Sequence, residues 1–427
     1  MSNISMSEKI VLKSFIGKTI PLEKLCISIV DCPHSTPKWS EDGLIVVRNF
    51  NIKNGSLDLS NPSYTDKDSF DERIKRAKPE SGDIIITREA PMGQVCMIPE
   101  GVECCLGQRM VLIKVDTKKI TSEYLLFALQ SEFVQKQIKK SDKTGSIVSN
   151  LCIPDLKALE IPVLDNTVAV ASILKSIVNK IDLNNRINAE LEAMAKTLYD
   201  YWFVQFDFPD ANGKPYKTSG GKMVYNATLK RETPASWKIG NASELFNFNP
   251  PTSLKTGSLA SYIDMDSLPV KGFMTKKIQK KGFAGGTKFI KNDVAVARIT
   301  PCLENGKTGL ISKLKQGEVG FGSTEFIILR GKDISLSGFG ACLARSDSFR
   351  QFAISNMTGT SGRKRIESKI LETYTLPIPS KSLLMKFENI VQPFFDIMTS
   401  KSIENDELTA LRDWLLPLLM NGQVTVK

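Results

Sequence analysis

An internal repeat constrains the fold of this chain more than any other feature of its sequence. Residues 82–98 are GDIIITREAPMGQVCMI, and residues 292–311 are NDVAVARITPCLENGKTGLI. The two segments align at residues that match in type and order: Asp83 with Asp293, Arg88 with Arg298, Pro91 with Pro301 and, after a three-residue insertion, Gly93 with Gly306.

The same alignment continues toward the end of each half. Its later pairs are Gly107 with Gly322, Pro162 with Pro377, Leu191 with Leu408 and Leu198 with Leu415. The separation in sequence is nearly the same for every pair, and the pairs occur in the same order. A duplication explains this regularity, so the sequence predicts two similar mixed domains, each followed by a helix.

Short runs rich in β-branched residues predict the strands of each domain. They cover residues 83–87 and 110–115 in the first half, and residues 293–299 and 325–330 in the second. Apolar residues at a spacing of three to four predict one further helix in each half, over residues 122–140 and 338–356.

Two long helices follow these domains. Residues 166–202 contain no Gly or Pro, and their apolar residues lie close to a coiled-coil seam. In the second copy, over residues 390–418, we expect Pro393 to kink or restart the helix and Pro417 to loosen its last turn. Neither helix can bury its seam alone, so an antiparallel pairing between the domains is the simplest structure. The alternative is two unrelated core helices.

Composition limits the class of protein. At 427 residues the chain has room for two to three domains. No segment approaches the roughly 18 apolar residues of a membrane span, and the N-terminus lacks a signal-peptide core, so we expect a cytoplasmic protein. Eight cysteines without a Cys-x-x-Cys pair, and a single histidine, His34, disfavour a zinc site and histidine-based catalysis.

Three short motifs suggest chemistry that their surroundings do not support. Asn249-Pro250-Pro251 is similar to an adenine methyltransferase site but lacks the following aromatic residue, and no Gly-rich cofactor loop precedes it. ENGKTG, residues 304–309, contains the Gly-Lys-Thr of a P-loop. The residue five positions before Gly306 is Pro301, where a P-loop needs glycine. His34 aligns with a proline in the second half. We therefore expect no catalytic site.

The charge of the chain points to a polyanionic partner. The net charge is +11, and residues 271–315 contain eleven Lys and Arg against two acidic residues. Arg and Gln or Asn are the usual partners of guanine and adenine edges, and Lys and Arg contact phosphates. The candidate DNA contacts are Arg88, Gln94, Gln108, Arg109, Lys139, Lys140, Lys143, Lys276, Lys277, Lys288, Arg298, Lys307, Arg363, Lys364 and Arg365.

Several segments resemble one protein family. LNNRINAELEAMAKTLYDYWFVQFDFP, residues 183–209, and LTALRDWLLPLLMNGQVTV, residues 408–426, are similar to the central and distal conserved helices of type I restriction–modification specificity (S, HsdS) subunits. YLLFALQSEFVQKQIKK, TGSIVSNL, LKALEIPV, DCPHSTPK and LGQRMVLIK resemble parts of the target-recognition domains of that family.

The resemblance implies an α+β chain with two tandem mixed α/β target-recognition domains and two long helices in an antiparallel coiled coil, related by a pseudo-twofold repeat. Its expected parts are residues 1–163 (first recognition domain), 164–206 (central helix), 207–235 (linker), 236–379 (second recognition domain) and 380–427 (distal helix). Each domain would read one half of a bipartite double-stranded DNA site, and the helices would set the spacer.

The same resemblance implies the partners. Two methyltransferase (M) subunits would carry S-adenosylmethionine, two restriction (R) subunits would use ATP and Mg²⁺, and this chain would hold no cofactor or metal and no catalytic site. The expected subunit interface on the central helix comprises Arg186, Glu190, Lys196, Trp202 and Phe203. The cluster YDYWFVQF, residues 199–206, could instead be core against the neighbouring domain.

Three other functions stay open from the sequence. They are a free-standing nuclease or methyltransferase with a diverged site, a scaffold or RNA-binding protein, and a specificity subunit with a fused or atypical methyltransferase. The bases recognised and the spacer length do not follow from the sequence.

Overall fold

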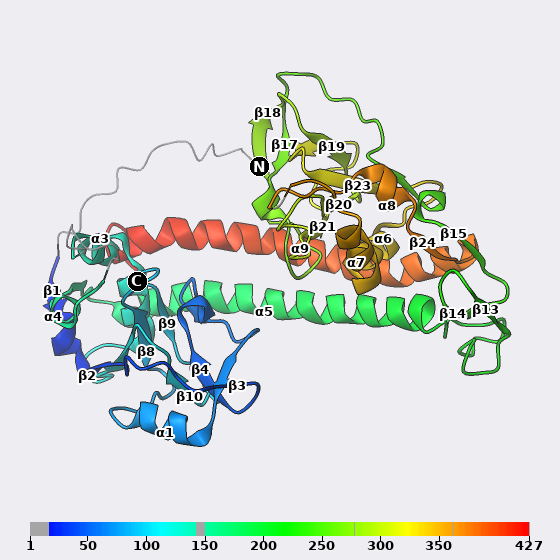
Figure 1. The fold of residues 1–427 in the computed structure, drawn as a ribbon. Helices are drawn as coiled ribbons and strands as arrows, with labels where there is room; N and C mark the ends of the chain where they lie inside the picture. The colour runs from blue at the N-terminus through cyan, green and yellow to red at the C-terminus, as the bar shows by residue number, and fades with distance from the viewer. Residues whose placement is uncertain (1–16, 142–149, 277, 361, 427) are drawn as a thin grey trace. The chain divides into compact units, whose positions relative to one another are not determined.

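The structure is a computed structural model that describes residues 17–141, 150–276, 278–360 and 362–426. The chain forms two compact units: unit 1 is Met1–Lys180 with Leu408–Lys427, and unit 2 is Ile181–Glu407. The unit boundaries fall inside the two longest helices, α5 (Thr167–Tyr199) and α9 (Lys381–Met420) (Figure 1). Within the described ranges, no helix is both long and apolar enough to cross a membrane.

Unit 1 contains two four-stranded sheets. The first is antiparallel, in the order β2-β11-β8-β9, with bounds Cys26–Asp31, Met110–Val115, Ile84–Thr87 and Val95–Met97. The second has the order β10-β4-β7-β3, with bounds Cys104–Leu106, Leu44–Val47, Ser63–Thr65 and Trp39–Ser40, and its β10–β4 pair is parallel.

Unit 2 also contains two four-stranded sheets. The antiparallel one has the order β16-β23-β20-β21, with bounds Phe246–Phe248, Phe326–Gly331, Val294–Ala297 and Thr308–Leu310. The other has the order β18-β17-β22-β19, with bounds Gln279–Gly282, Leu259–Ile263, Val319–Gly322 and Thr287–Ile290, and its β17–β22 pair is parallel. All four predicted strands are confirmed, as β8, β11, β20 and β23.

The β-branched strands are buried on both faces, which explains their composition. Ile84 and Ile86 of β8 face a core shared with the helices of unit 1, whereas Ile85, on the opposite face, joins a core with the second sheet. Val294 and Ala295 of β20 divide between two cores in the same way. The period of two along a strand therefore serves two cores at once.

The additional helix predicted in each half is two helices. They are α2 (Ser122–Gln130) and α3 (Glu132–Lys140) in unit 1, and α6 (Ser337–Arg345) and α7 (Asp347–Ser355) in unit 2. The break occurs at Ser131 and Ser346, which have extended backbones. Each side chain accepts the N–H of the residue three positions later, so each serine caps a new helix.

Shorter elements complete the units. In unit 1 they are β1 (Thr19–Pro21), β5 (Ile52–Lys53), β6 (Ser56–Leu57), α1 (Lys67–Ile74), α4 (Ile153–Lys157) and β12 (Glu160–Pro162). In unit 2 they are β13 (Met223–Asn226), β14 (Arg231–Pro234), β15 (Lys238–Asn241), α8 (Ser368–Glu372) and β24 (Thr375–Ile378). Strand β1 pairs with β12, and β15 pairs with β24, so each pair joins the two ends of a domain.

The two long helices contact each other within each unit. In unit 1, Val170 and Leu174 of α5 share a core with Leu419 of α9. In unit 2, the Asn184 side-chain amide donates to Asn405 Oδ1 at 2.9 Å. The Trp202 ring, in the π-helical turn Asp200–Val204 that follows α5, lies 5.9 Å from the ring of Phe387. Residue numbers rise along one helix as they fall along the other, so the contacts in unit 2 are antiparallel.

Helix α9 is continuous from Lys381 to Met420. Pro393 does not restart the helix, and Pro417 lies inside it. A proline removes one backbone hydrogen bond. Buried Val391 and Phe395 on either side of Pro393 fix the helix to the core of unit 2, so packing maintains the helix through that loss.

Candidate nucleic-acid interface

Arg88 follows strand β8 and is held inside unit 1. Its Nη1 lies 2.8 Å from Asp31 Oδ2, its Nε donates to the Leu151 carbonyl at 3.0 Å, and its side chain is only 12% exposed. The guanidinium therefore ties the end of β2 to residue 151. This position leaves little of it available for a DNA phosphate.

Arg298 follows β20 at the equivalent backbone position in unit 2. Arg298 N–H donates to the Glu325 carbonyl and its own carbonyl accepts from Ile366, just as Arg88 N–H donates to Arg109 and its carbonyl accepts from Leu151. Its side chain differs, because Arg298 Nε is buried and has no hydrogen-bond partner among the described residues. The backbone at this position is thus shared, whereas the side-chain contacts are not.

The backbone carbonyls that accept the N–H groups of Arg88 and Arg298 belong to residues whose side chains have opposite charges. Arg109 is more than half exposed and forms an ion pair with Glu89 at 3.1 Å. Glu325 instead accepts from Arg365, whose Nε lies 3.0 Å from both carboxylate oxygens and whose Nη2 lies 2.8 Å from Oε1. The hydrogen bond with Glu325 raises the pKa of Arg365. Each unit presents an ion pair at this edge, with the signs exchanged.

Two more predicted contacts are engaged within their own unit, and a third is half-buried. Lys307 Nζ donates to the Met265 carbonyl and to Asp266 Oδ1, and its side chain is 17% exposed. The Gln108 amide donates to the His34 carbonyl. Gln94 is half-buried. The Lys307 charge is therefore paired, and the two glutamines add no charge to this edge.

Other predicted cations are accessible. Lys139 and Lys140 are exposed at the end of α3, and Arg363 and Lys364 are exposed near the Arg365 ion pair. Lys276 is also exposed, whereas Lys288 is half-buried 5.7 Å from the centre of the Phe283 ring. Lys143 and Lys277 lie outside the described residues.

The basic run of residues 271–315 does not form one free surface. Lys280 pairs with Glu318 at 2.7 Å, and Lys281 Nζ lies 4.6 Å from the centre of the Tyr262 ring. Lys313 is almost fully buried beside Asp406, at 2.6 Å, and burial lowers its pKa. Several lysines of this run therefore form ion pairs or cation–π contacts within unit 2.

The sequence search missed one exposed group. The Arg48 guanidinium lies 4.9 Å from the ring centres of both Trp39 and Phe50. Arg48 and Phe50 are neighbours in the sequence, but Trp39 is not. Strands β3 and β4 both pair with β7, where Thr65 faces Trp39 as well as Leu44, and this pairing brings the three side chains together. Only the strand register could have revealed it.

The residues expected at a subunit interface divide into two sets. Arg186, Glu190 and Lys196 are exposed on α5. Trp202 and Phe203 are buried in the core of unit 2, where the Phe203 ring lies within 5.0 Å of Phe339 and Phe387. Their burial corrects the interface prediction for these two rings: they belong to the core, which was the alternative interpretation.

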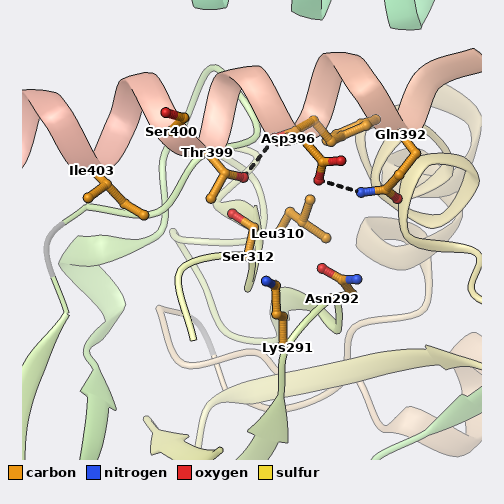
Figure 2. A pocket seen from close by; sticks show the side chains of 10 residues that line it. Lys291, Asn292, Leu310, Ser312, Gln392, Asp396, Thr399, Ser400 and Ile403 are labelled. Carbon is orange, nitrogen blue, oxygen red and sulfur yellow. Dashed lines mark hydrogen bonds between the residues drawn. The ribbon is translucent and has the colours of Figure 1, made fainter. Parts of the chain in front are cut away.

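A shallow cleft of about 290 Å³ lies between α9 and residues 291–292 in unit 2 (Figure 2). Its polar groups on the helix bond to one another: Gln392 Nε2 donates to Asp396 Oδ1 at 2.8 Å, and Thr399 Oγ1 to the Phe395 carbonyl at 2.7 Å. The lining contains no histidine or cysteine. Across the described parts of the chain, no three His, Cys, Asp or Glu side chains gather to hold a metal ion.

Comparisons with known proteins agree with this architecture. The family described as "Type I restriction modification DNA specificity domain" matches residues 36–193. The MjaIX type I restriction enzyme specificity subunit of Methanocaldococcus jannaschii is 24% identical over 359 residues, which cover 81% of this chain and 78% of that protein. The EcoAI specificity subunit of Escherichia coli is 31% identical over 42% of this chain and 31% of its own length.

A solved structure shares the fold. The S subunit of a type I restriction–modification system from M. genitalium superposes with a TM-score of 0.57 at 17% identity, over 96% of this chain and 97% of that one. Residues 36–193 therefore match the type I restriction–modification DNA specificity family, and the chain is similar in sequence to type I specificity subunits over most of its length. Its fold is shared with a solved S subunit.

Proposed function

We propose that this chain recognises a bipartite double-stranded DNA sequence, with one half bound by each unit. The observation that carries the proposal is the pair of equivalent edges. Both units have an antiparallel sheet with the same order of connections, and the same backbone hydrogen bonds follow the strands β8 and β20. The side chains at these edges differ in charge, as expected if two similar scaffolds bind different half-sites.

In this proposal the recognition domains are residues 1–163 and 236–379, connected by a central helix (164–206), a linker (207–235) and a distal helix (380–427). The two helices form an antiparallel coiled coil that sets the spacer between the half-sites. Their contacts within each unit support this arrangement. The two domains are the products of one internal duplication.

The chain also binds methyltransferase subunits through the exposed faces of these helices. In unit 2, Ile390 and Ile397 of α9 are exposed and one heptad apart, so they lie on one face of the helix. In unit 1, Leu411 and Trp414 of the same helix are exposed. Apolar side chains left in water along a helix favour a protein partner. The exposed charged residues Arg186, Glu190 and Lys196 of α5 would contribute charged contacts.

The chemistry resides on those partners. S-adenosylmethionine is bound by two methyltransferase subunits, and ATP and Mg²⁺ by two restriction subunits, in the cytoplasm of the cell. The chain itself selects the DNA without cofactor, metal or catalysis.

Co-expression with the type I methyltransferase subunit of the same genome tests this function. Single-molecule sequencing of N6-methyladenine should show a split motif with two different halves around a fixed gap. A host with the methyltransferase subunit alone is the control. Methylation without a motif, or a stable complex that methylates nothing, would contradict the proposal.

A further inference from the structure

Arg48 forms the middle of an exposed stack on unit 1, which we name the Trp39–Arg48–Phe50 stack. The guanidinium carbon lies 4.9 Å from each ring centre, and each ring is 45% exposed. A guanidinium that contacts two aromatic rings is attracted by both, and these contacts restrict its orientation. The two rings contact the guanidinium, and its N–H donors remain for a ligand.

The backbone holds this stack in place. Arg48 directly follows β4, and its N–H donates to Asn51 Oδ1 at 2.9 Å. Asn51 is 1% exposed and its amide donates to the Asp58 carbonyl at 2.9 Å. Phe50 lies in the tight 3-10 turn between them, Asn49–Asn51. The stack is therefore built on a buried polar anchor.

The N–H donors of the Arg48 guanidinium are not used inside the described part of the protein. Among the residues that the structure describes, no acceptor receives a hydrogen bond from its guanidinium. Arg73 in the same unit is the opposite case, because its three nitrogens donate to the carbonyls of Leu106, Ser35 and Pro33. Arg73 thus donates three hydrogen bonds, whereas Arg48 is stacked and its five donors have no acceptor among the described residues.

The stack adjoins the edge that contains Gln108 and Arg109. Gly107 N–H donates to the Val47 carbonyl at 2.8 Å, and a Cβ added to Gly107 would lie 3.6 Å from Arg48 Cγ. The Asn49 amide donates to the carbonyl of Glu89, which pairs with Arg109. These contacts make the stack and the Arg109 ion pair one continuous surface.

We propose that the Trp39–Arg48–Phe50 stack binds a guanine in the half-site of unit 1, through the N–H edge of Arg48. This inference rests on the proposed function. An arginine donating to O6 and N7 of guanine is the commonest specific contact in the major groove, and a stacked arginine is already oriented for it. In unit 2 the residue after β17 is Asp264, which accepts the Ser267 N–H. Unit 2 therefore has no equivalent guanine contact at this described position.

Selection of bound sequences from a randomised DNA duplex pool tests the proposal. The full chain would be used as wild type, Arg48→Ala, Arg48→Lys and Lys67→Ala. Lys67 is the matched control, because its charge is also exposed on unit 1 and lies 5.5 Å from the Phe70 ring. Thermal unfolding of each variant verifies that it is folded.

For Arg48→Ala we expect loss of a guanine preference at one position in one half-site, and about 10-fold weaker binding of the duplex selected by wild type. Arg48→Lys should lose the same preference, because it keeps the charge but not the fork of donors. Lys67→Ala should keep every preference. If Arg48→Ala keeps every preference, or weakens all sequences equally, the guanine contact is refuted. If the wild type selects no sequence at all, the proposed function fails instead.

Discussion

The edges of unit 1 and unit 2 share a backbone and differ in charge. After β8 and β20, an arginine makes the same two backbone hydrogen bonds in each unit. The residue that accepts its N–H is Arg109 in unit 1 and Glu325 in unit 2, and the residue after the parallel strand is Arg48 in one and Asp264 in the other. The backbone at these positions is therefore shared, while the side chains that it carries differ in charge.

The largest expected effect concerns stability. Arg88→Ala leaves the partly buried Asp31 without its arginine, and we expect a loss of about 2 to 3 kcal/mol in the free energy of unfolding. Arg298→Ala removes no paired partner of this kind and should cost less than about 1 kcal/mol. Urea unfolding measures both. Equal losses would mean that the two arginines have the same structural role.

The first helix of each helix pair gives a second contrast. Helix α2 is capped by Thr121, the residue directly before it. Helix α6 has no side-chain cap at its own N-cap residue, and the N–H groups of Gly338 and Phe339 donate instead to Glu388 of α9. Burial raises the pKa of Glu388 from 4.5 to about 7. Because the folded-state pKa lies above the unfolded one, this group lowers stability as pH rises from about 4.5 through 7.

Glu388→Gln removes this titration. Between pH 5 and 8, the stability of wild type relative to this variant should fall by at most about 3 kcal/mol, and it should be flat above pH 8. Thr121→Ala should cost about 1 kcal/mol at every pH. Urea unfolding across this pH range distinguishes the two caps, and parallel profiles for wild type and Glu388→Gln would contradict the assignment.

The third effect is on DNA affinity. Replacing Arg363, Lys364 and Arg365 with Ala should reduce the salt dependence of DNA binding by about two units rather than three, because Glu325 already engages Arg365. Fluorescence anisotropy of a labelled duplex at several salt concentrations measures the slope. The control replaces Lys67, Lys75 and Lys78, three exposed lysines of unit 1 that are each paired with an acid. An equal change in that control would indicate a general charge effect.

The smallest expected effect tests the reversed ion pairs directly. Glu325→Ala frees Arg365, and Glu89→Ala frees Arg109. Each should raise the affinity for random duplex DNA about 3-fold at low salt and steepen the salt dependence by about one unit. If Glu325→Ala instead weakens binding of the selected duplex alone, Glu325 contacts a base itself.

Local sequence patterns predicted the helices and strands better than they predicted the contacts between them. The buried strands β8 and β20 follow from their β-branched runs, and helix α5 from its apolar spacing. The break at Ser131 was missed because a serine cap can lie inside a continuous apolar pattern. The helix does not restart at Pro393, because residues distant in the sequence supply the packing that maintains α9 there.

The candidate site was less predictable for the same reason. Arginines at strand ends are visible in the sequence. Whether their donors form hydrogen bonds inside the protein depends on residues far away, such as Leu151 for Arg88. The burial of Trp202 depends on Phe387, which lies in the last long helix of the chain. The Arg48 stack depends on strand register. The sequence shows which residues are arginines, but it does not show which of them have donors left for a ligand.

Unit 1 is built from two segments that are far apart in the sequence, and this affects when its core can form during synthesis. Its core contains Val170 and Leu174, but also Leu419 and Met420, and all of unit 2 is translated between them. At about 5 to 20 residues per second, the ribosome needs roughly 10 to 50 seconds to make the intervening segment. Unit 2, a continuous stretch of chain, can complete its core first. During that interval the early segment of unit 1, Met1–Lys180, lacks the residues of α9 that cover part of its apolar core.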